Sequence, residues 1–159
     1  MAQKDIHFGL FIVYNIIDEI VPGGVIMAKI SDIIFCLRAT NVEGEGASAH
    51  TILTALTPEY VPGLFSFSII VNLLDIDLEH EHKFKIDFIS PSEEEVLNIS
   101  GDLPIMDIRT NLPKEYNGIN IAMDWNNVNF KSSGLYIIRV YVDDVLIKEK
   151  EIFVKGKNE

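Results

Sequence analysis

The sequence predicts an all-β fold, an antiparallel β-sandwich, from its residue usage, its alternating hydrophobicity and the spacing of its turn residues. The chain holds 24 Ile and 12 Val, 36 in all, against 20 Leu and Ala together. Branching at Cβ suits a pleated sheet better than a helix. Several short segments alternate apolar and polar residues, and clusters of Pro, Gly and Ser separate them. Short strands at this spacing, without a long helical period, are typical of a sandwich.

Length and composition indicate one domain over residues 1–159. The chain has 159 residues, of which 48% are hydrophobic, enough to bury a core without disulfides or a structural metal. Its formal charge of −11 argues against nucleic acid or an anionic membrane as the partner. The single Cys36 cannot form an internal disulfide, and we see neither a leader nor a membrane-spanning run. We therefore expect a cytoplasmic protein.

The first 60 residues give the weakest pattern. Residues 1–30 are expected to form an extension packed on the domain, in which the apolar Ile6–Ile17 is either an added strand or a short buried helix, and we favour the strand. Val42–Ser48 has the composition of a flexible loop. His50–Leu56 is either a strand or a helical turn, and we favour the strand.

The middle of the chain alternates more clearly. Leu64–Leu74 has apolar residues at every odd position from 65 to 73, which predicts a strand. Leu78–Phe88 alternates as strictly, with charges at the odd positions, and predicts a second strand. Asp75–Asp77 is the expected turn, so the two strands should form an antiparallel hairpin.

The C-terminal third repeats this design. Ile119–Met123 suggests one strand, and Leu135–Val142 predicts another. That second strand has one buried face, made of Tyr136, Ile138, Val140 and Val142. Asp143 and Asp144 should turn the chain into a return strand over residues 145–147 and 151–154, and residues 155–159 are expected to fray.

Three segments resemble an uncharacterised family of small bacterial and phage β-sandwich proteins, a domain of unknown function. Ser31–Cys36 is similar to its opening strand, Pro62–Ile69 with His82–Phe88 and Pro91 to its central hairpin, and Asn129–Tyr136 with Val140–Asp143 to its closing motif. The closing pattern, Phe-x-x-x-Gly-x-Tyr followed by Val-x-Val-Asp, recurs in immunoglobulin-like sandwiches. The resemblance implies an immunoglobulin-like fold over residues 31–154 and a phage or defence-related setting, and it carries no site residues.

Two clusters invite a metal. His80 and His82 fall on one side of a strand and could share an ion with His50 or a carboxylate. Glu79 and Glu81 would point away from them, so we favour amphipathic side chains at the rim of the sandwich. The acidic series Asp75, Asp77, Glu79 and Glu81 lacks the Gly of a calcium loop and is interpreted as a solvated face.

Two further features are weighed as catalytic and set aside. Gly44–Gly46, followed by Ser48 and His50, has neither the Lys-Ser/Thr pair of a phosphate-binding loop nor the Gly-x-Ser-x-Gly frame of a nucleophile. Cys36 lies among apolar neighbours, which predicts an inert, buried thiol. We predict no catalytic, cofactor-binding or metal-ligating residues and no cofactor.

Charge and surplus apolar surface are the more informative features. Residues 75–96 hold eight acidic residues and two Lys, a net −6, and Glu93–Glu95 should concentrate this charge on one side of the domain. Such a surface either serves solubility, which is the commoner case, or docks a basic partner. Strands that are apolar on both faces, through Ile70 and Leu74 or through Ile137 and Tyr141, suggest covering structure or a subunit interface.

Three functions follow in order of preference. The first is a non-catalytic protein-interaction or structural module that is homo-oligomeric. The second is a protein that binds or sequesters a small anionic ligand, for which Arg38, Arg109 and Arg139 would have to converge in one pocket. The third is a metal-dependent hydrolase using His80 and His82.

Overall fold

The computed structural model describes residues 4–10, 28–42, 46–106 and 113–159, and within them the chain is built of β-strands. These are β1 (Lys4–Leu10), β2 (Lys29–Val42), β3 (Gly46–Ile52), β4 (Ala55–Leu56), β5 (Gly63–Leu74), β6 (Lys83–Ile89), β7 (Glu95–Asp102), β8 (Gly118–Phe130), β9 (Gly134–Val142) and β10 (Val145–Val154). A single 3₁₀ turn, η1 (Lys114–Tyr116), is the one helical element of the described residues. The predicted all-β class is confirmed.

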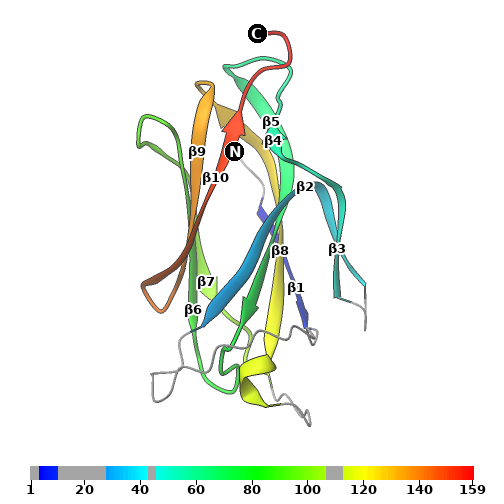
Figure 1. Ribbon diagram of the computed structural model, residues 1–159, viewed down its shortest axis with the longest axis vertical. Helices are drawn as coiled ribbons and strands as arrows, with labels where there is room; N and C mark the ends of the chain where they lie inside the picture. Colours follow the sequence, from blue (N-terminus) through cyan, green and yellow to red (C-terminus); the bar gives the residue numbers. More distant parts are fainter. Residues whose placement is uncertain (1–3, 11–27, 43–45, 107–112) are drawn as a thin grey trace.

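The strands form two five-stranded sheets (Figure 1). The first sheet has the order β1-β8-β5-β2-β3, and the second has the order β4-β10-β9-β6-β7. All neighbours are antiparallel except β4 and β10, which are parallel. At the N-terminus, Lys4–Leu10 is a strand rather than the alternative short helix, whereas residues 11–17 of the predicted element lie outside the described residues.

The main core lies between the two sheets and is rich in aromatic rings. Phe67 and Trp125 of the first sheet meet edge to face at 5.3 Å, and Phe88 of the second sheet lies 5.5 Å from both Trp125 and Tyr136. The predicted inner face of β9 is confirmed, because Tyr136, Ile138 and Val140 are fully buried and Val142 nearly so. Burial of this apolar area is the main stabilising contribution to the fold.

One predicted hairpin is wrong. β5 belongs to the first sheet and β6 to the second, so the chain crosses the core between them instead of turning back on itself. Residues 75–82 make this crossing, anchored by the buried Ile76 and Leu78. Strand β6 starts only at Lys83, because Asp77 Oδ1 accepts a 3.0 Å hydrogen bond from the Glu79 N–H and closes a turn where alternation suggested a strand.

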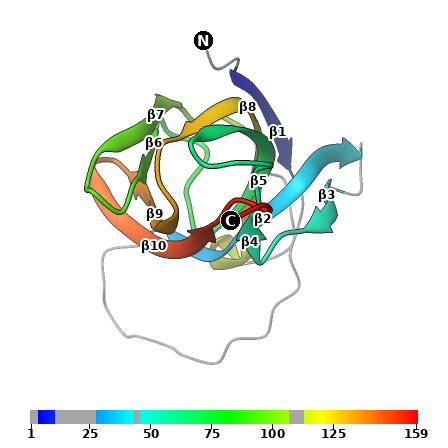
Figure 2. The same ribbon diagram turned by 90° about the horizontal axis from the view of Figure 1, so that it is seen from above.

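A second, smaller apolar cluster lies on the other face of the first sheet. Cys36, Ala39, Ile70 and Ala122 are buried there, with Ala47 and Ala49 of β3 packed against them. The hairpin of β2 and β3 folds back over this face (Figure 2), so that Cα atoms of the edge strands β1 and β3 come within 8 Å. The doubly apolar character predicted for Ile70 is thus explained by cover from this chain.

Four local predictions need correction. The expected loop at Val42–Ser48 is shorter, since β2 runs to Val42 and β3 starts at Gly46. The tail at residues 155–159 is not frayed: the N–H groups of Lys155 and Lys157 donate to the carbonyls of Leu56 and Pro58. Strand β7 was not predicted at all. The single strand expected at His50–Leu56 is divided: residues 50–52 end β3 of the first sheet, and Ala55–Leu56 form β4 of the second sheet.

Candidate functional site

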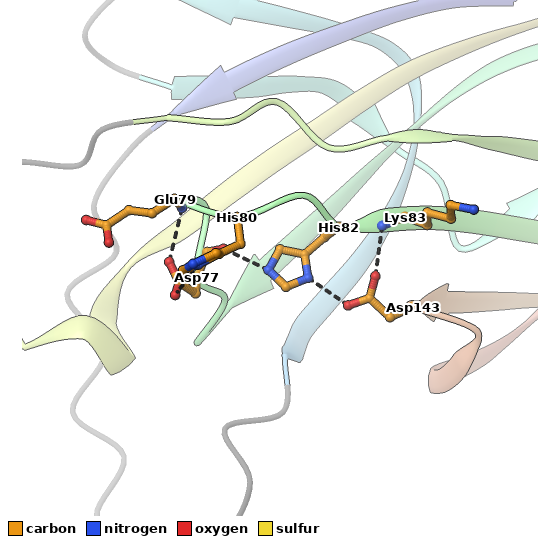
Figure 3. A network of polar contacts seen from close by, with 6 residues as sticks. All are labelled: Asp77, Glu79, His80, His82, Lys83 and Asp143. Carbon is orange, nitrogen blue, oxygen red and sulfur yellow. Dashed lines mark hydrogen bonds and ion pairs between the residues drawn. The ribbon is translucent and has the colours of Figure 1, made fainter.

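The two candidate histidines lie in the crossing from β5 to β6, and both bond to Asp77 (Figure 3). His80 Nδ1 is 2.9 Å from Asp77 Oδ2 at an exposed position. His82 is held at both ring nitrogens, with Nδ1 2.7 Å from Asp143 Oδ2 and Nε2 2.7 Å from the Asp77 carbonyl. Asp143 Oδ1 also accepts a 2.9 Å bond from the Lys83 N–H, so three segments meet at His82.

Both partners of His82 are acceptors, and this determines its chemistry. A carbonyl and an ionised carboxylate can only accept, so the two bonds are made together only when both ring nitrogens carry a hydrogen, as in an imidazolium. Burial alone would lower the pKa of His82, but the hydrogen bonds to Asp143 and to the Asp77 carbonyl raise it above its ordinary value. Burial likewise opposes the shift at Asp143, where the His82 and Lys83 bonds lower the pKa. While both of these bonds are made, His82 has no free lone pair to offer a metal or a reacting proton.

The histidines considered together for a metal do not converge. His50 lies on β3 in the first sheet, where its Nε2 is 3.2 Å from Thr40 Oγ1. In the described parts of the chain, no three His, Cys, Asp or Glu side chains gather closely enough to hold an ion. The acidic series of residues 75–81 lies in the same crossing, with Glu79 and Glu81 exposed.

Cys36 has the character of an inert thiol. It is fully buried in the second apolar cluster. Burial raises its pKa, and the nearby charge of Asp124 raises it further, against a smaller opposite effect of the Arg38 and His50 backbone groups. The glycine segment considered for catalysis lies at the other end of the β2–β3 hairpin, where Gly46 and Ser48 belong to β3 and residues 43–45 are outside the described residues.

The arginines that an anionic ligand would need are not brought together. Arg38 lies on β2 in the first sheet, and Arg139 lies on β9 in the second. Arg139 is already engaged, since its Nε donates to Glu149 at 2.6 Å. Arg109 lies outside the described residues. Neither described arginine lines the cavity that lies between the β6–β7 loop and the β8–β9 loop.

The acidic residues divide into two groups instead of forming one side. Asp75–Glu81 and the Asp143-Asp144 turn lie at the start of β6, whereas Glu93–Glu95 follow its end. The seven residues of β6 separate the two groups by roughly 20 Å at about 3.3 Å per residue. The expected single acidic side is therefore wrong, because the intervening strand places the two groups at opposite ends of the second sheet.

The loop from β6 to β7 is organised by Ser90, which is 9% exposed. Its Oγ accepts from the Glu94 N–H at 3.1 Å and lies 2.9 Å from Ser92 Oγ. Its N–H donates to the Glu94 carbonyl, and its carbonyl accepts from the Glu93 N–H. This tight turn leaves the side chains of Glu93, Glu94 and Glu95 exposed.

A cavity of about 500 Å³ opens beside this loop. Its walls come from both sheets: the start of β5, the β6–β7 loop, the first residues of β7, the end of β8 and the β8–β9 loop. Glu94 and Glu95 contribute carboxylates, Val96 and Leu97 contribute apolar surface, and Lys131 contributes the cation that contacts Glu94 at 3.3 Å. Cavities of this size accept a drug-sized molecule or one long side chain.

Two backbone features shape the cavity. Asn127 has a φ of 54°, and its N–H donates to Ser66 Oγ at 2.9 Å where β8 bulges against β5. Gly134 has a φ of 141°, and a Cβ there would lie 2.8 Å from Pro91 Cγ. The absent side chain lets the β8–β9 loop approach the β6–β7 loop closely.

Sequence reasoning identified the acidic loop but missed the cavity. Glu93–Glu95 stood out as a charge cluster, and Pro91-Ser92 as a turn. The other wall, at Asn127–Ser132, is remote in sequence, and the closing motif that begins at Asn129 was interpreted only as a sign of the fold. Only the pairing of β8 with β5 and of β9 with β6 brings the walls together.

Comparison with known proteins shows the family to which the chain belongs. It matches a family of unknown function, DUF6941, over residues 31–155. Because this match spans most of the chain, the protein belongs to this family of unknown function. No curated protein matches it. In the part of the chain that the structure describes, no helix is long and apolar enough to cross a membrane.

Proposed function

We propose that this protein is a non-catalytic binding module, an immunoglobulin-like β-sandwich that docks a basic protein partner at the acidic rim of the cavity. The rim is defined as Glu93, Glu94 and Glu95. The resemblance to bacterial and phage proteins supports a bacterial or phage setting, and the lone buried Cys36 fits a cytoplasmic one.

The charge imbalance of the rim carries the proposal. Three adjacent carboxylates are exposed there, and among the described residues only Lys131 reaches ion-pair distance of any of them. With three carboxylates against the one cation of Lys131, the surface carries net negative charge, and such a surface attracts a positively charged partner and speeds its association. The same surface would repel the anionic ligand of the second sequence hypothesis.

The absence of a reacting group in the candidate positions supports binding over catalysis. Both nitrogens of His82 are used within the fold, and Cys36 is buried with a raised pKa. Neither side chain lines the cavity. A binding role needs only the shape and charge of the rim.

The test is calorimetric titration with heptalysine amide. Wild type is compared with a rim variant carrying Glu93→Gln, Glu94→Gln and Glu95→Gln, and with a control carrying Glu81→Gln, Asp144→Asn and Glu151→Gln. Both variants lose three negative charges from exposed positions. Three exposed ion pairs sum to about 0.6–3 kcal/mol, so we expect the rim variant to bind roughly 3- to 100-fold more weakly.

The control should retain most of the wild-type affinity. Equal losses in both variants would show that net charge alone attracts the peptide, and the rim would then have no special role. Affinity should also fall as salt is raised, because exposed charges are screened.

Self-association is a second proposed property, favoured by one apolar patch. Phe153 is 62% exposed on the outer face of the second sheet, opposite Leu135 in register and close to Ile137, which pairs with Ile89. Native mass spectrometry should find a homo-oligomer that Phe153→Glu dissociates. Ile105→Glu, at another exposed apolar position, should leave it intact. A monomeric wild type at all concentrations would refute self-association.

A further inference from the structure

Strand β7 forms the outer border of the second sheet. It pairs with β6 on one side, and within the described ranges no strand pairs with its other side. Its eight residues, Glu95–Asp102, are longer than a typical short protective edge. Alternate residues of such a strand direct their backbone N–H and C=O groups outward, where a further strand can accept and donate hydrogen bonds.

The charges on β7 disfavour pairing with a second copy of itself. Glu95 and Asp102 stand at its two ends. An antiparallel copy would set Glu95 opposite Asp102, and a parallel copy would set like residues side by side. Like charges directly opposite each other destabilise a strand pair. No Lys or Pro lies on β7, and the register shift between the pairs Phe88–Leu97 and Ile89–Glu95 places one bulge, at Val96, near its start. From Leu97 to Asp102 the register with β6 is regular, so this stretch of the edge disfavours a second copy of β7 and suits a basic strand.

The outer edge of β7, with which no described strand pairs, runs into the cavity. Glu95, Val96 and Leu97 belong both to β7 and to the cavity wall, and β7 lies beside β8 at this border (Figure 2). A strand added to β7 would send alternate side chains toward the sheet interior, about 6.8 Å apart. One of these would enter the cavity mouth. Its walls suit a lysine or arginine, with apolar surface at Val96 for the stem and the Glu94 carboxylate for the charged end.

We infer that the partner is an extended, basic segment of another protein that adds as a strand to the outer edge of β7 and places one lysine or arginine in the cavity. This inference rests on the proposed function and names the form of the partner. Main-chain hydrogen bonds to β7 would supply affinity, and the cavity and Glu93–Glu95 would supply selectivity for basic side chains.

The probe is the peptide acetyl-Thr-Lys-Thr-Lys-Thr-Lys-Thr-amide. A matched peptide carries the same side chains with N-methylated backbone amides, so it keeps the charge but cannot pair as a strand. A third peptide has Glu in place of Lys. Affinity is measured by calorimetry, and amide hydrogen exchange is followed along β7 in the full chain.

We expect the first peptide to slow exchange of alternate amides between Glu95 and Asp102 by at least about tenfold at saturation, since only the bound edge is protected. The N-methylated peptide should bind at least about tenfold more weakly and protect none of them, and the Glu peptide should not bind.

The outcomes separate this inference from the proposed function. Equal binding of the first two peptides, with unchanged exchange in β7, overturns strand addition but leaves the acidic docking rim standing. Failure of all peptides, heptalysine included, overturns both. Binding of the Glu peptide as tightly as the Lys peptide overturns the basic character of the partner.

Discussion

Replacing Tyr136 with Asp should remove most of the stability of the fold. Tyr136 is fully buried on β9, with its ring stacked 5.5 Å from Phe88 and edge-on 5.3 Å from Phe130. Its hydroxyl donates to the Ser132 carbonyl at 2.8 Å. The substitution deletes the ring from the aromatic core and puts a carboxylate there without a partner.

The magnitude follows from these two losses. Removing a large aromatic side chain from a core costs about 3–5 kcal/mol, before the unpaired charge is added. We therefore expect a loss of at least about 4 kcal/mol, out of a total stability on the order of 5–15 kcal/mol. For a domain of this size the melting temperature should fall by roughly 8–16 °C or more, at about 2–4 °C per kcal/mol.

Two variants make the assay specific, and both are read by thermal and urea unfolding. Tyr136→Phe keeps the ring and loses only the Ser132 hydrogen bond, so it should cost about 1 kcal/mol. Tyr141→Asp changes the same residue type on the opposite, half-buried face of β9 and should cost much less than Tyr136→Asp. An unchanged melting temperature in Tyr136→Asp, or a larger loss in Tyr141→Asp, would show that the two faces of β9 are assigned the wrong way round.

Three further predictions concern the pH response, the cavity backbone and the thiol. His82→Gln should lower the free energy of unfolding by about 1–2 kcal/mol between roughly pH 4 and 6.5, as measured by urea unfolding. This figure already allows for solvent screening of Asp143, whose side chain is about half exposed. The raised His82 pKa means that its contribution is complete below the ordinary histidine pKa and is lost as pH rises through the folded value, whereas the Asp143 contribution is lost in acid. A difference between wild type and variant that does not shrink at high pH would contradict the imidazolium. Gly134→Ala should lower stability by about 1–3 kcal/mol, because φ is 141° and the new Cβ meets Pro91; an unaffected melting curve would mean that the two loops separate freely. Cys36 should react with a maleimide only after unfolding, and rapid labelling of the native protein at neutral pH would contradict its buried, protonated state.

The strands with strict alternation were predictable because the alternation of apolar and polar residues within a strand is enough to assign its buried face. Leu135–Val142 alternates over its whole length, and the faces assigned from it agree with the burial of Tyr136 and Val140. The turn after it was equally readable, since Asp143 and Asp144 both adopt positive φ, at 50° and 64°. Asp tolerates that conformation better than most residues.

The remaining errors arose where a pattern has two physical explanations. Leu78–His82 alternates like a strand, but the Asp77 side chain closes a turn there and the buried Leu78 anchors a crossing between sheets. Adjacent strands in sequence usually pair, and nothing local in β5 or β6 reveals that they belong to different sheets. Strand β7 was not predicted because only Ile99 of its residues is deeply buried, so its sequence shows little alternation of apolar and polar residues.

The candidate site was predictable only in part for the same reason. Composition alone identified Glu93–Glu95 as a charged loop, and Glu94 and Glu95 of this loop line one wall of the cavity. Its opposite wall at Asn127–Ser132 depends on a bulge in β8 and on the close approach at Gly134, which are properties of the tertiary fold.

The central claim, a basic partner docked at the rim Glu93–Glu95, is tested most directly by mapping heptalysine amide on the ¹⁵N-labelled protein. We expect the amide shifts to change at residues 93–97 and 127–132, with residues 77–83 and 143–144 unaffected. Residues 77–83 and 143–144 lie at the other acidic end of the second sheet, so they are an internal control within the same chain. Shift changes centred on residues 77–83, or spread evenly over all exposed carboxylates, would contradict the account.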